Sequence, residues 1–147
     1  MKVSSPLYLV GKEISCWKCN SKMSAVGLLA PENDEQELEG EFPSLMDITV
    51  LPKELEKQIQ SRVPSFEYRF SNTVGYKYYA NVCESCDMIS GDFFLHSEPG
   101  GPFFPYDEAE AKELYMIELA LEGSVEIDCS YHIGSGKLIL NHARKNA

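Results

Sequence analysis

Two short segments, CWKC at residues 16–19 and CESC at residues 83–86, decide how the chain is organised. Each is a Cys-x-x-Cys pair, and the two intervening residues allow one tight turn to present both sulfurs to a single ion. Zinc binds thiolate at about 2.3 Å and takes four ligands where its role is structural. The two pairs therefore predict one structural Zn²⁺ site. Its ligands are Cys16, Cys19, Cys83 and Cys86.

The residue after each pair agrees with this interpretation. A zinc knuckle folds backbone N–H groups back toward the sulfurs, which usually forces the residue after the second cysteine into the left-handed region. Here these positions hold Asn20 and Asp87, residue types that tolerate positive φ better than others apart from glycine. Both pairs thus have the turn chemistry of a knuckle.

Local disulfides, ordinary buried thiols and a thioredoxin-like redox motif are the alternatives for such pairs. A redox motif would end a strand and open a helix, whereas Cys16 is followed by a Lys/Asn/Ser turn and a further apolar segment. Two matched pairs in a chain with no evident export signal favour metal binding.

Length and composition predict a single domain over residues 1–147. The chain has 147 residues, of which 44% are hydrophobic, which is enough for one ordinary core. Residues 1–10 do not resemble a signal peptide, and no apolar run approaches the roughly 18 residues of a membrane span. We therefore expect a cytoplasmic protein, in a compartment where thiols stay reduced.

The formal net charge of −10, from 13 basic and 23 acidic residues, argues against nucleic-acid binding, which needs clustered Lys and Arg. It favours a protein partner with a basic surface. The alternative is that the acidity only keeps the protein in solution. The acidic residues of the expected partner surface lie in a loop and at the start of a helix: Glu32, Asp34, Glu35, Glu37, Glu39, Glu41, Glu108, Glu110 and Glu113.

The first two thirds of the chain show clear local patterns. Apolar and alternating segments predict strands, and apolar residues repeating every four positions predict one helix that ends at Pro64. The expected strands are 7–14, 25–30, 45–51, 66–70 and 76–82, and the expected helix is 53–63. An acidic loop at 31–41 separates the second and third strands. The first cysteine pair then lies at the tip of a hairpin.

The last third is harder to interpret. Periodicity does not separate helix from strand over residues 92–96, and residues 99–105 form an irregular turn. Asp107 and Glu110 resemble a capping box, which predicts a helix to about Tyr115. Alternation predicts a hairpin over residues 116–129, and a final strand over 137–140. The fold class is therefore α+β, with antiparallel sheet hairpins and two short helices built around a four-cysteine zinc ribbon.

Phe66, Tyr68 and Phe70 alternate with charged residues along one expected strand. Such aromatic residues can stack on bases in single-strand binders, but those surfaces also carry a basic groove. The shortage of positive charge nearby instead predicts a packed sheet face.

Two segments of the sequence resemble a group of uncharacterised bacterial zinc-ribbon proteins. The resemblance covers about a third of the chain, in residues 16–29 and 71–105. It includes CWKC followed by VGLL, then SNTVGYKYYANVC, and finally GDFFLH and EPGGPF. In that group, glycine usually follows the second cysteine of each pair, where this chain has Asn20 and Asp87. The resemblance implies a metal-stabilised domain and brings neither catalytic residues nor a substrate.

The sequence contains no motif that points to an enzyme. There is no nucleophile elbow, phosphate-binding loop or His-Glu-x-x-His helix, so no catalytic residue is assigned. His96 could replace one cysteine ligand and leave an open, catalytic position, although two complete pairs make this unnecessary. Cys129 lies on the apolar side of its strand and is expected to act as a small hydrophobe. His132 and His142 have no evident partners.

The leading interpretation is a small zinc-binding protein that acts as a protein-binding module, for example an inhibitor or immunity-type partner of a basic toxin or nuclease. The alternative is an enzyme or a nucleic-acid-associated zinc-ribbon factor whose site the sequence does not reveal.

Overall fold

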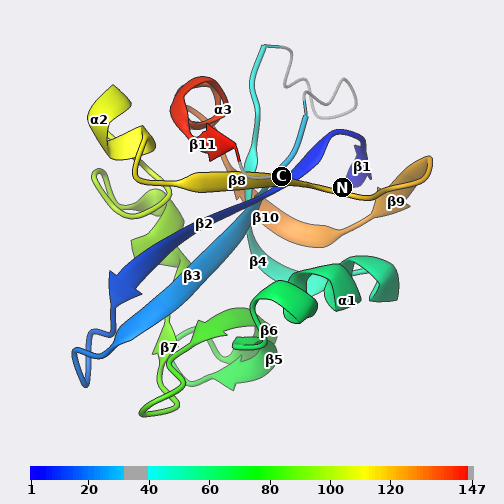
Figure 1. Ribbon diagram of the computed structural model, residues 1–147. Helices are drawn as coiled ribbons and strands as arrows, with labels where there is room; N and C mark the ends of the chain where they lie inside the picture. The colour runs from blue at the N-terminus through cyan, green and yellow to red at the C-terminus, as the bar shows by residue number, and fades with distance from the viewer. Residues whose placement is uncertain (32–39, 146–147) are drawn as a thin grey trace.

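The computed structural model describes residues 1–31 and 40–145 and has an α+β architecture (Figure 1). A six-stranded sheet has the order β10-β4-β3-β2-β8-β11, and a separate three-stranded sheet has the order β5-β6-β7. The strands of the large sheet are β2 (Leu7–Ser15), β3 (Lys22–Leu29), β4 (Ser44–Val50), β8 (Tyr115–Leu119), β10 (Asp128–His132) and β11 (Arg144–Lys145). The small sheet contains β5 (Phe66–Ser71), β6 (Tyr76–Val82) and β7 (Ile89–Ser90). Strands β1 (Lys2–Ser4) and β9 (Ser124–Glu126) form a two-stranded ribbon.

The two hairpins that carry the cysteines are confirmed. Strands β2 and β3 pair antiparallel from Tyr8↔Leu29 to Ser15↔Lys22, so the first cysteine pair lies at their tip. Strands β5 and β6 pair antiparallel across the predicted turn, and β6 ends immediately before Cys83. The long β2–β3 hairpin extends toward the small sheet (Figure 1).

Helix α1 (Lys53–Arg62) is also confirmed, and Pro52 immediately precedes it. Its residues Leu55 and Ile59, one turn apart, are fully buried in the main apolar cluster with Phe66 and Tyr79 of the small sheet. The small sheet is also joined to the large one by Asn81, whose buried side-chain amide accepts from the N–H of Val26 and donates to its carbonyl. These contacts fix the small sheet against β3.

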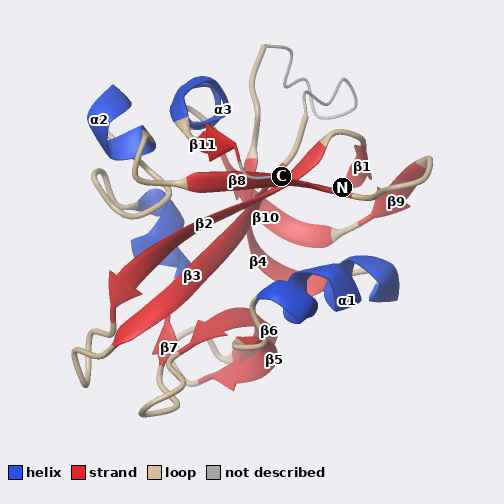
Figure 2. Cartoon of the chain, viewed as in Figure 1, coloured by secondary structure: helices blue, strands red, loops and turns tan. Residues whose placement is uncertain are grey.

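The opposite face of the large sheet carries a second apolar cluster, which includes Leu29, Leu95, Phe103 and Ile139. It is covered by a short π-helical turn, η2 (Phe93–Ser97), by the irregular segment after it and by α3 (Gly136–His142). Figure 2 shows helices on both sides of the strands. The described residues contain four short helices, whereas the sequence predicted two.

The predicted hairpin over residues 116–129 is wrong. The alternating residues do form strands, but β8 pairs with β2, β9 with β1 and β10 with β4. Residues Met116, Ile117 and Leu119 are buried, because β8 lies inside the large sheet rather than at the edge of a local ribbon.

The predicted final strand over residues 137–140 is wrong as well. These residues lie in α3, in which Ile139 is buried, as is Ala143 immediately after the helix. Helix α2 (Glu108–Ala111) begins at the predicted Asp107 cap but ends earlier than expected, since Tyr115 already starts β8. Residues 92–96, for which the sequence did not separate helix from strand, are helical: Asp92 immediately precedes η2, and residues 93–96 lie within it.

The prediction of a packed aromatic face on β5 is correct only for Phe66. Phe66 is buried and stacks on Tyr79, with ring centroids 5.9 Å apart. Tyr68 and Phe70 are 47% and 54% exposed, because the buried cluster under α1 includes the Phe66 end of the strand and not the far end. The acidic loop predicted at 31–41 falls mostly outside the described residues.

No helix in the part of the chain that the structure describes combines the length and apolar character needed to cross a membrane.

Candidate functional site

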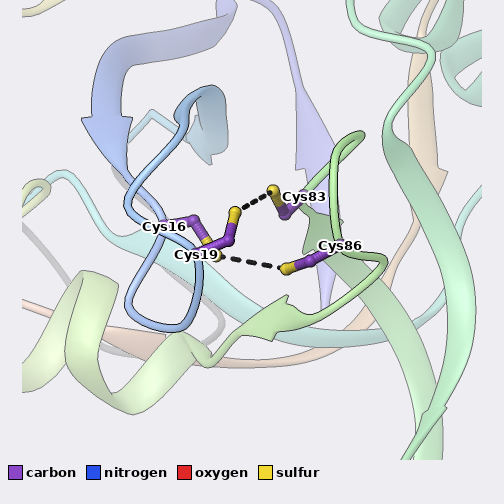
Figure 3. Close-up of side chains that lie close together, drawn as sticks. All are labelled: Cys16, Cys19, Cys83 and Cys86. Atoms are coloured by element: carbon purple, nitrogen blue, oxygen red, sulfur yellow. Dashed lines mark hydrogen bonds between the residues drawn. The ribbon is translucent and has the colours of Figure 1, made fainter.

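The structure brings the four predicted metal-ligating cysteines together. Their sulfur atoms all lie within 4.8 Å of one another. The Sγ atoms of Cys16 and Cys86 are 3.6 Å apart, as are those of Cys19 and Cys83 (Figure 3). A tetrahedral site with metal–sulfur bonds of about 2.3 Å has sulfur–sulfur edges of about 3.8 Å. The cluster therefore has the size that holds one metal ion.

The two cysteine turns have the same backbone geometry. The N–H of Cys16 donates to the Ser21 carbonyl, and the N–H of Cys83 donates to the Met88 carbonyl, both at 2.8 Å. Asn20 and Asp87 each donate back to the first cysteine carbonyl of their own turn, at 2.9 and 2.8 Å.

Both predicted left-handed residues are found as expected, at φ values of 63° for Asn20 and 67° for Asp87. All five cysteines are free thiols, so neither pair forms a local disulfide.

Hydrogen bonds within the cluster shift the pKa values of the thiols in opposite directions. Hydrogen bonds from the Ser21 side chain and backbone lower the pKa of Cys19 to about 6. A backbone hydrogen bond to Cys19 is the main cause that lowers the pKa of Cys16. A Met88 backbone hydrogen bond lowers the pKa of Cys86, but burial and shared hydrogen bonds with the other cysteines raise it overall. These hydrogen bonds favour the thiolate forms of Cys16 and Cys19, and a cation among the sulfurs would favour deprotonation of all four.

Two contacts fasten the cluster to the surrounding fold. The indole N–H of Trp17 donates to the Ile89 carbonyl at 2.8 Å, which joins the first cysteine turn to β7. Arg69 of β5 forms an ion pair with Asp87, with a shortest distance of 2.6 Å, and so joins the second turn to the small sheet. The hydrogen bonds and charge of Asp87 raise the pKa of Arg69, whose charge lowers the pKa of Asp87 in return.

His96 does not belong to the cluster. It is 1% exposed in the second apolar core, where its Nδ1 lies 2.9 Å from the Ser44 hydroxyl and its ring packs on Phe103. A Cβ placed on Gly27 would come within 2.7 Å of the His96 ring, so that glycine is needed for the close approach. Burial, with a smaller contribution from His132, lowers the pKa of His96 to about 3. A neutral Ser–His pair enclosed in this way is a packing contact rather than a nucleophile exposed to substrate.

The remaining candidates also lie apart from the cysteines. Cys129 packs at the margin of the main core, and burial raises the pKa of its thiol to about 11. The ring of His132 packs against Phe104 in a tilted arrangement, and its Nε2 is buried without a hydrogen-bond partner among the described residues. His142 lies 3.6 Å from Glu108.

A groove that the sequence did not predict lies beside the cysteine cluster. It has a volume of about 480 Å³, and we call it the acidic groove. Its aromatic and apolar walls include the exposed Trp17, Phe93 and Phe94, and two carboxylates also line it. The residues that line it include Trp17, Asp47, Tyr78, Asp92, Phe93 and Phe94.

Asp47 and Asp92 come from β4 and from the residue before η2, and they are in direct contact. The Asp92 carboxylate accepts a hydrogen bond of 2.8 Å from the Asp47 backbone N–H. Asp47 has a φ of 49°, a left-handed conformation within a strand. The pKa of Asp92 is raised to about 7: burial is the main cause, the Asp47 N–H opposes it and the Asp47 charge adds to it. Burial also raises the pKa of Asp47.

The sequence contained weak signals for this groove. Asp47 is the single charged residue within the apolar run of β4, and Asp92 begins the segment 92–96, over which periodicity does not separate helix from strand. Their positions are 45 residues apart, so only the folded chain brings them together.

Comparisons of the chain with models of protein families, with curated proteins and with solved structures find no match in any of the three.

Proposed function

We propose that the protein is a zinc-stabilised protein-binding module whose partner has a basic surface. The observation that carries this proposal is the acidic groove beside the cysteine cluster. Its walls expose Trp17 and Phe93 at 67% and 68% of their surface, together with the 45%-exposed Phe94. Large aromatic side chains left in water at one site are typical of interaction surfaces.

The metal in this proposal is one Zn²⁺, which the four cysteines hold in a structural role. Four thiolates form a closed tetrahedral donor set, and Zn²⁺ is the usual occupant of such sites. The ion would fasten the β2–β3 hairpin to the segment after β6, and both of these segments supply walls of the groove. The resemblance to zinc-ribbon proteins and a reducing cytoplasmic location are both consistent with this role.

The partner in this proposal is basic because the protein is strongly acidic. With a net charge of −10, its long-range field attracts positively charged surfaces and repels nucleic acid. An inhibitor or immunity-type role toward a basic toxin or nuclease would fit these properties.

The test compares two phenylalanine variants that differ in position but are similar in exposure. Phe93→Ala removes a wall of the acidic groove, whereas Phe70→Ala removes a side chain that is 54% exposed on β5 and does not line it. Each variant and the wild-type protein are immobilised and offered extract of the source cell. One stoichiometric basic protein should be retained by the wild type and by Phe70→Ala, and lost with Phe93→Ala.

Metal content and melting temperature, measured on the same three samples, must agree for the comparison to be valid. Equal retention by both variants would contradict the proposed surface. Retention of bare nucleic acid by the wild type, without a protein, would favour the alternative of a nucleic-acid-associated factor.

A further inference from the structure

We infer that the acidic groove is a binding site for an arginine side chain, supplied by the partner protein. The inference rests on the proposed function only for the source of that side chain. The site itself is argued from the walls, the charges and the volume of the groove.

The carboxylates of the groove lack a cationic partner in the described chain. Within residues 1–31 and 40–145, no lysine or arginine forms an ion pair with Asp47 or Asp92. The residues that line the groove include none that is basic. Two neighbouring acids, one of them 6% exposed, therefore lie in an apolar surrounding with only a backbone N–H to stabilise the buried one. A cation from outside the chain would supply the missing charge.

The charges of Asp47 and Asp92 act on two neighbouring tyrosines, of which Tyr78 lines the groove. Burial raises the pKa of Tyr78, and the charge of Asp92 raises it further. The pKa of Tyr76 is raised by the same causes, burial first and then the charges of Asp47 and Asp92. The potential at this site is therefore negative over several side chains, on both β4 and β6.

The aromatic walls favour a planar cation. Guanidinium stacks on aromatic faces and is less strongly hydrated than ammonium, so it gains more from a site with apolar walls. The Trp17 ring is held in place by the hydrogen bond from its indole N–H to the Ile89 carbonyl, and most of its surface stays exposed for stacking. The two carboxylates can accept the several N–H donors of one guanidinium group.

The groove is large enough to admit an arginine side chain. Its volume is about 480 Å³, within the range of about 300–1,000 Å³ found for sites that take small molecules. The cysteine cluster, by contrast, is sized for a single ion, so the two sites take different ligands.

The experiment uses Trp17 as the reporter, because it is the only tryptophan of the chain and lines the groove. The zinc-loaded protein is titrated at low salt with Nα-acetyl-L-arginine N-methylamide, while tryptophan fluorescence is recorded. The corresponding lysine and citrulline compounds serve as probes of the same format. Citrulline has nearly the shape of arginine without its charge.

The arginine probe should give a saturable change, the lysine probe a weaker one, and the citrulline probe none. Asp47→Asn and Asp92→Asn should each weaken arginine binding about tenfold, the loss expected for one charge-assisted interaction. Glu118→Gln is the matched control, because Glu118 is an exposed acid on β8, several strands away from β4 in the large sheet.

Asp92→Asn should fold, since an asparagine oxygen can accept the same Asp47 N–H; circular dichroism and metal content verify this. A citrulline response equal to that of arginine would overturn the inference, as would equal losses in Glu118→Gln. So would the absence of any saturable arginine response.

The two proposals fail separately. If Phe93→Ala abolishes partner capture while the arginine probe does not bind, the protein-binding function stands and the arginine site is wrong. If the probe binds but no protein is captured, the site stands and the proposed function is wrong.

Discussion

The cysteine cluster and the acidic groove are neighbours, because Trp17 lies between two of the cysteines and also lines the groove. Their negative groups are nevertheless arranged in different ways. In the cluster, four sulfurs converge on one point within 4.8 Å of one another. In the groove, the buried Asp92 and its neighbour Asp47 lie along one wall, beside exposed aromatic side chains. Four sulfurs that surround one point favour a metal ion. Two carboxylates beside aromatic side chains favour a flat cation, which can pair with their charge at its edge and stack on the rings. The two ligands that we propose therefore differ because the geometry of the charges differs, more than their number.

The largest expected effect tests the cluster. Cys16→Ser and Cys83→Ser each remove one ligand, and the free energy of zinc binding in small metal sites is on the order of 10 kcal/mol, comparable with the stability of a whole domain. Both variants should lose metal and melt at far lower temperature than the wild type. Elemental analysis, with about one zinc per wild-type chain expected, and melting curves measure this.

Cys129→Ser is the control, because Cys129 is a half-buried thiol outside the cluster. It should keep its metal and lose little stability. Equal losses at all three positions would mean that the cluster has no special role in folding, and a folded wild type without metal would refute the zinc site.

A smaller effect tests the groove, through the pH dependence of stability. Burial raises the pKa of Asp92 to about 7, above its value of about 3.9 in an unfolded chain. The folded state therefore binds more protons between about pH 4 and pH 7, and stability falls as pH rises through this window. Between pH 5.5 and 7 the wild type should lose about 2 kcal/mol from this group.

Asp92→Asn should flatten that decline and melt at a higher temperature than the wild type at pH 7.5. The titratable groups that face Asp92 are Asp47 on β4 and Tyr76 and Tyr78 on β6, and the two tyrosines do not ionise in this range. Thermal unfolding at several pH values, with Glu118→Gln as the control, provides the measurement. An unchanged slope in Asp92→Asn would show that its charge is already compensated.

The cluster could be predicted from the sequence because each half of it is local. The Cys-x-x-Cys spacing of CWKC and CESC is enough to predict the four ligands. The strands beside them are predicted by alternation within about ten residues. The left-handed Asn20 and Asp87 follow from the same local chemistry. To predict that the two pairs lie together, it was enough to assume that four thiolates bind one ion.

The groove and the last third of the fold could not be predicted in the same way. Alternation over residues 116–129 predicted the strands of a hairpin, but the partners of these strands are β1, β2 and β4, in the first third of the chain. The apolar run at 137–140 fits a strand or a buried helix equally well, and only the core contact of Ile139 and Ala143 decides it. Asp47 and Asp92 likewise come together only where β4 packs against the segment before η2.

The smallest expected effect compares the two cysteine turns with each other. Asn20 and Asp87 have nearly the same positive φ, so glycine should relieve the same backbone strain at both positions. Asn20→Gly should raise the stability slightly, by less than about 1 kcal/mol, while Asn20→Ala should lower it by about 1 kcal/mol. Chemical denaturation of the zinc-loaded protein measures both changes.

Asp87→Gly should gain less than Asn20→Gly, because it also removes the ion pair with Arg69. That pair is exposed and screened by salt, so the difference between the two glycine variants should shrink as the salt concentration rises. If Asn20→Gly and Asp87→Gly behave alike at every salt concentration, the Arg69 contact contributes nothing and the second turn is held by its cysteines alone. If Asn20→Ala is as stable as the wild type, the left-handed turn is not strained, and the preference for asparagine or glycine after the second cysteine needs another cause.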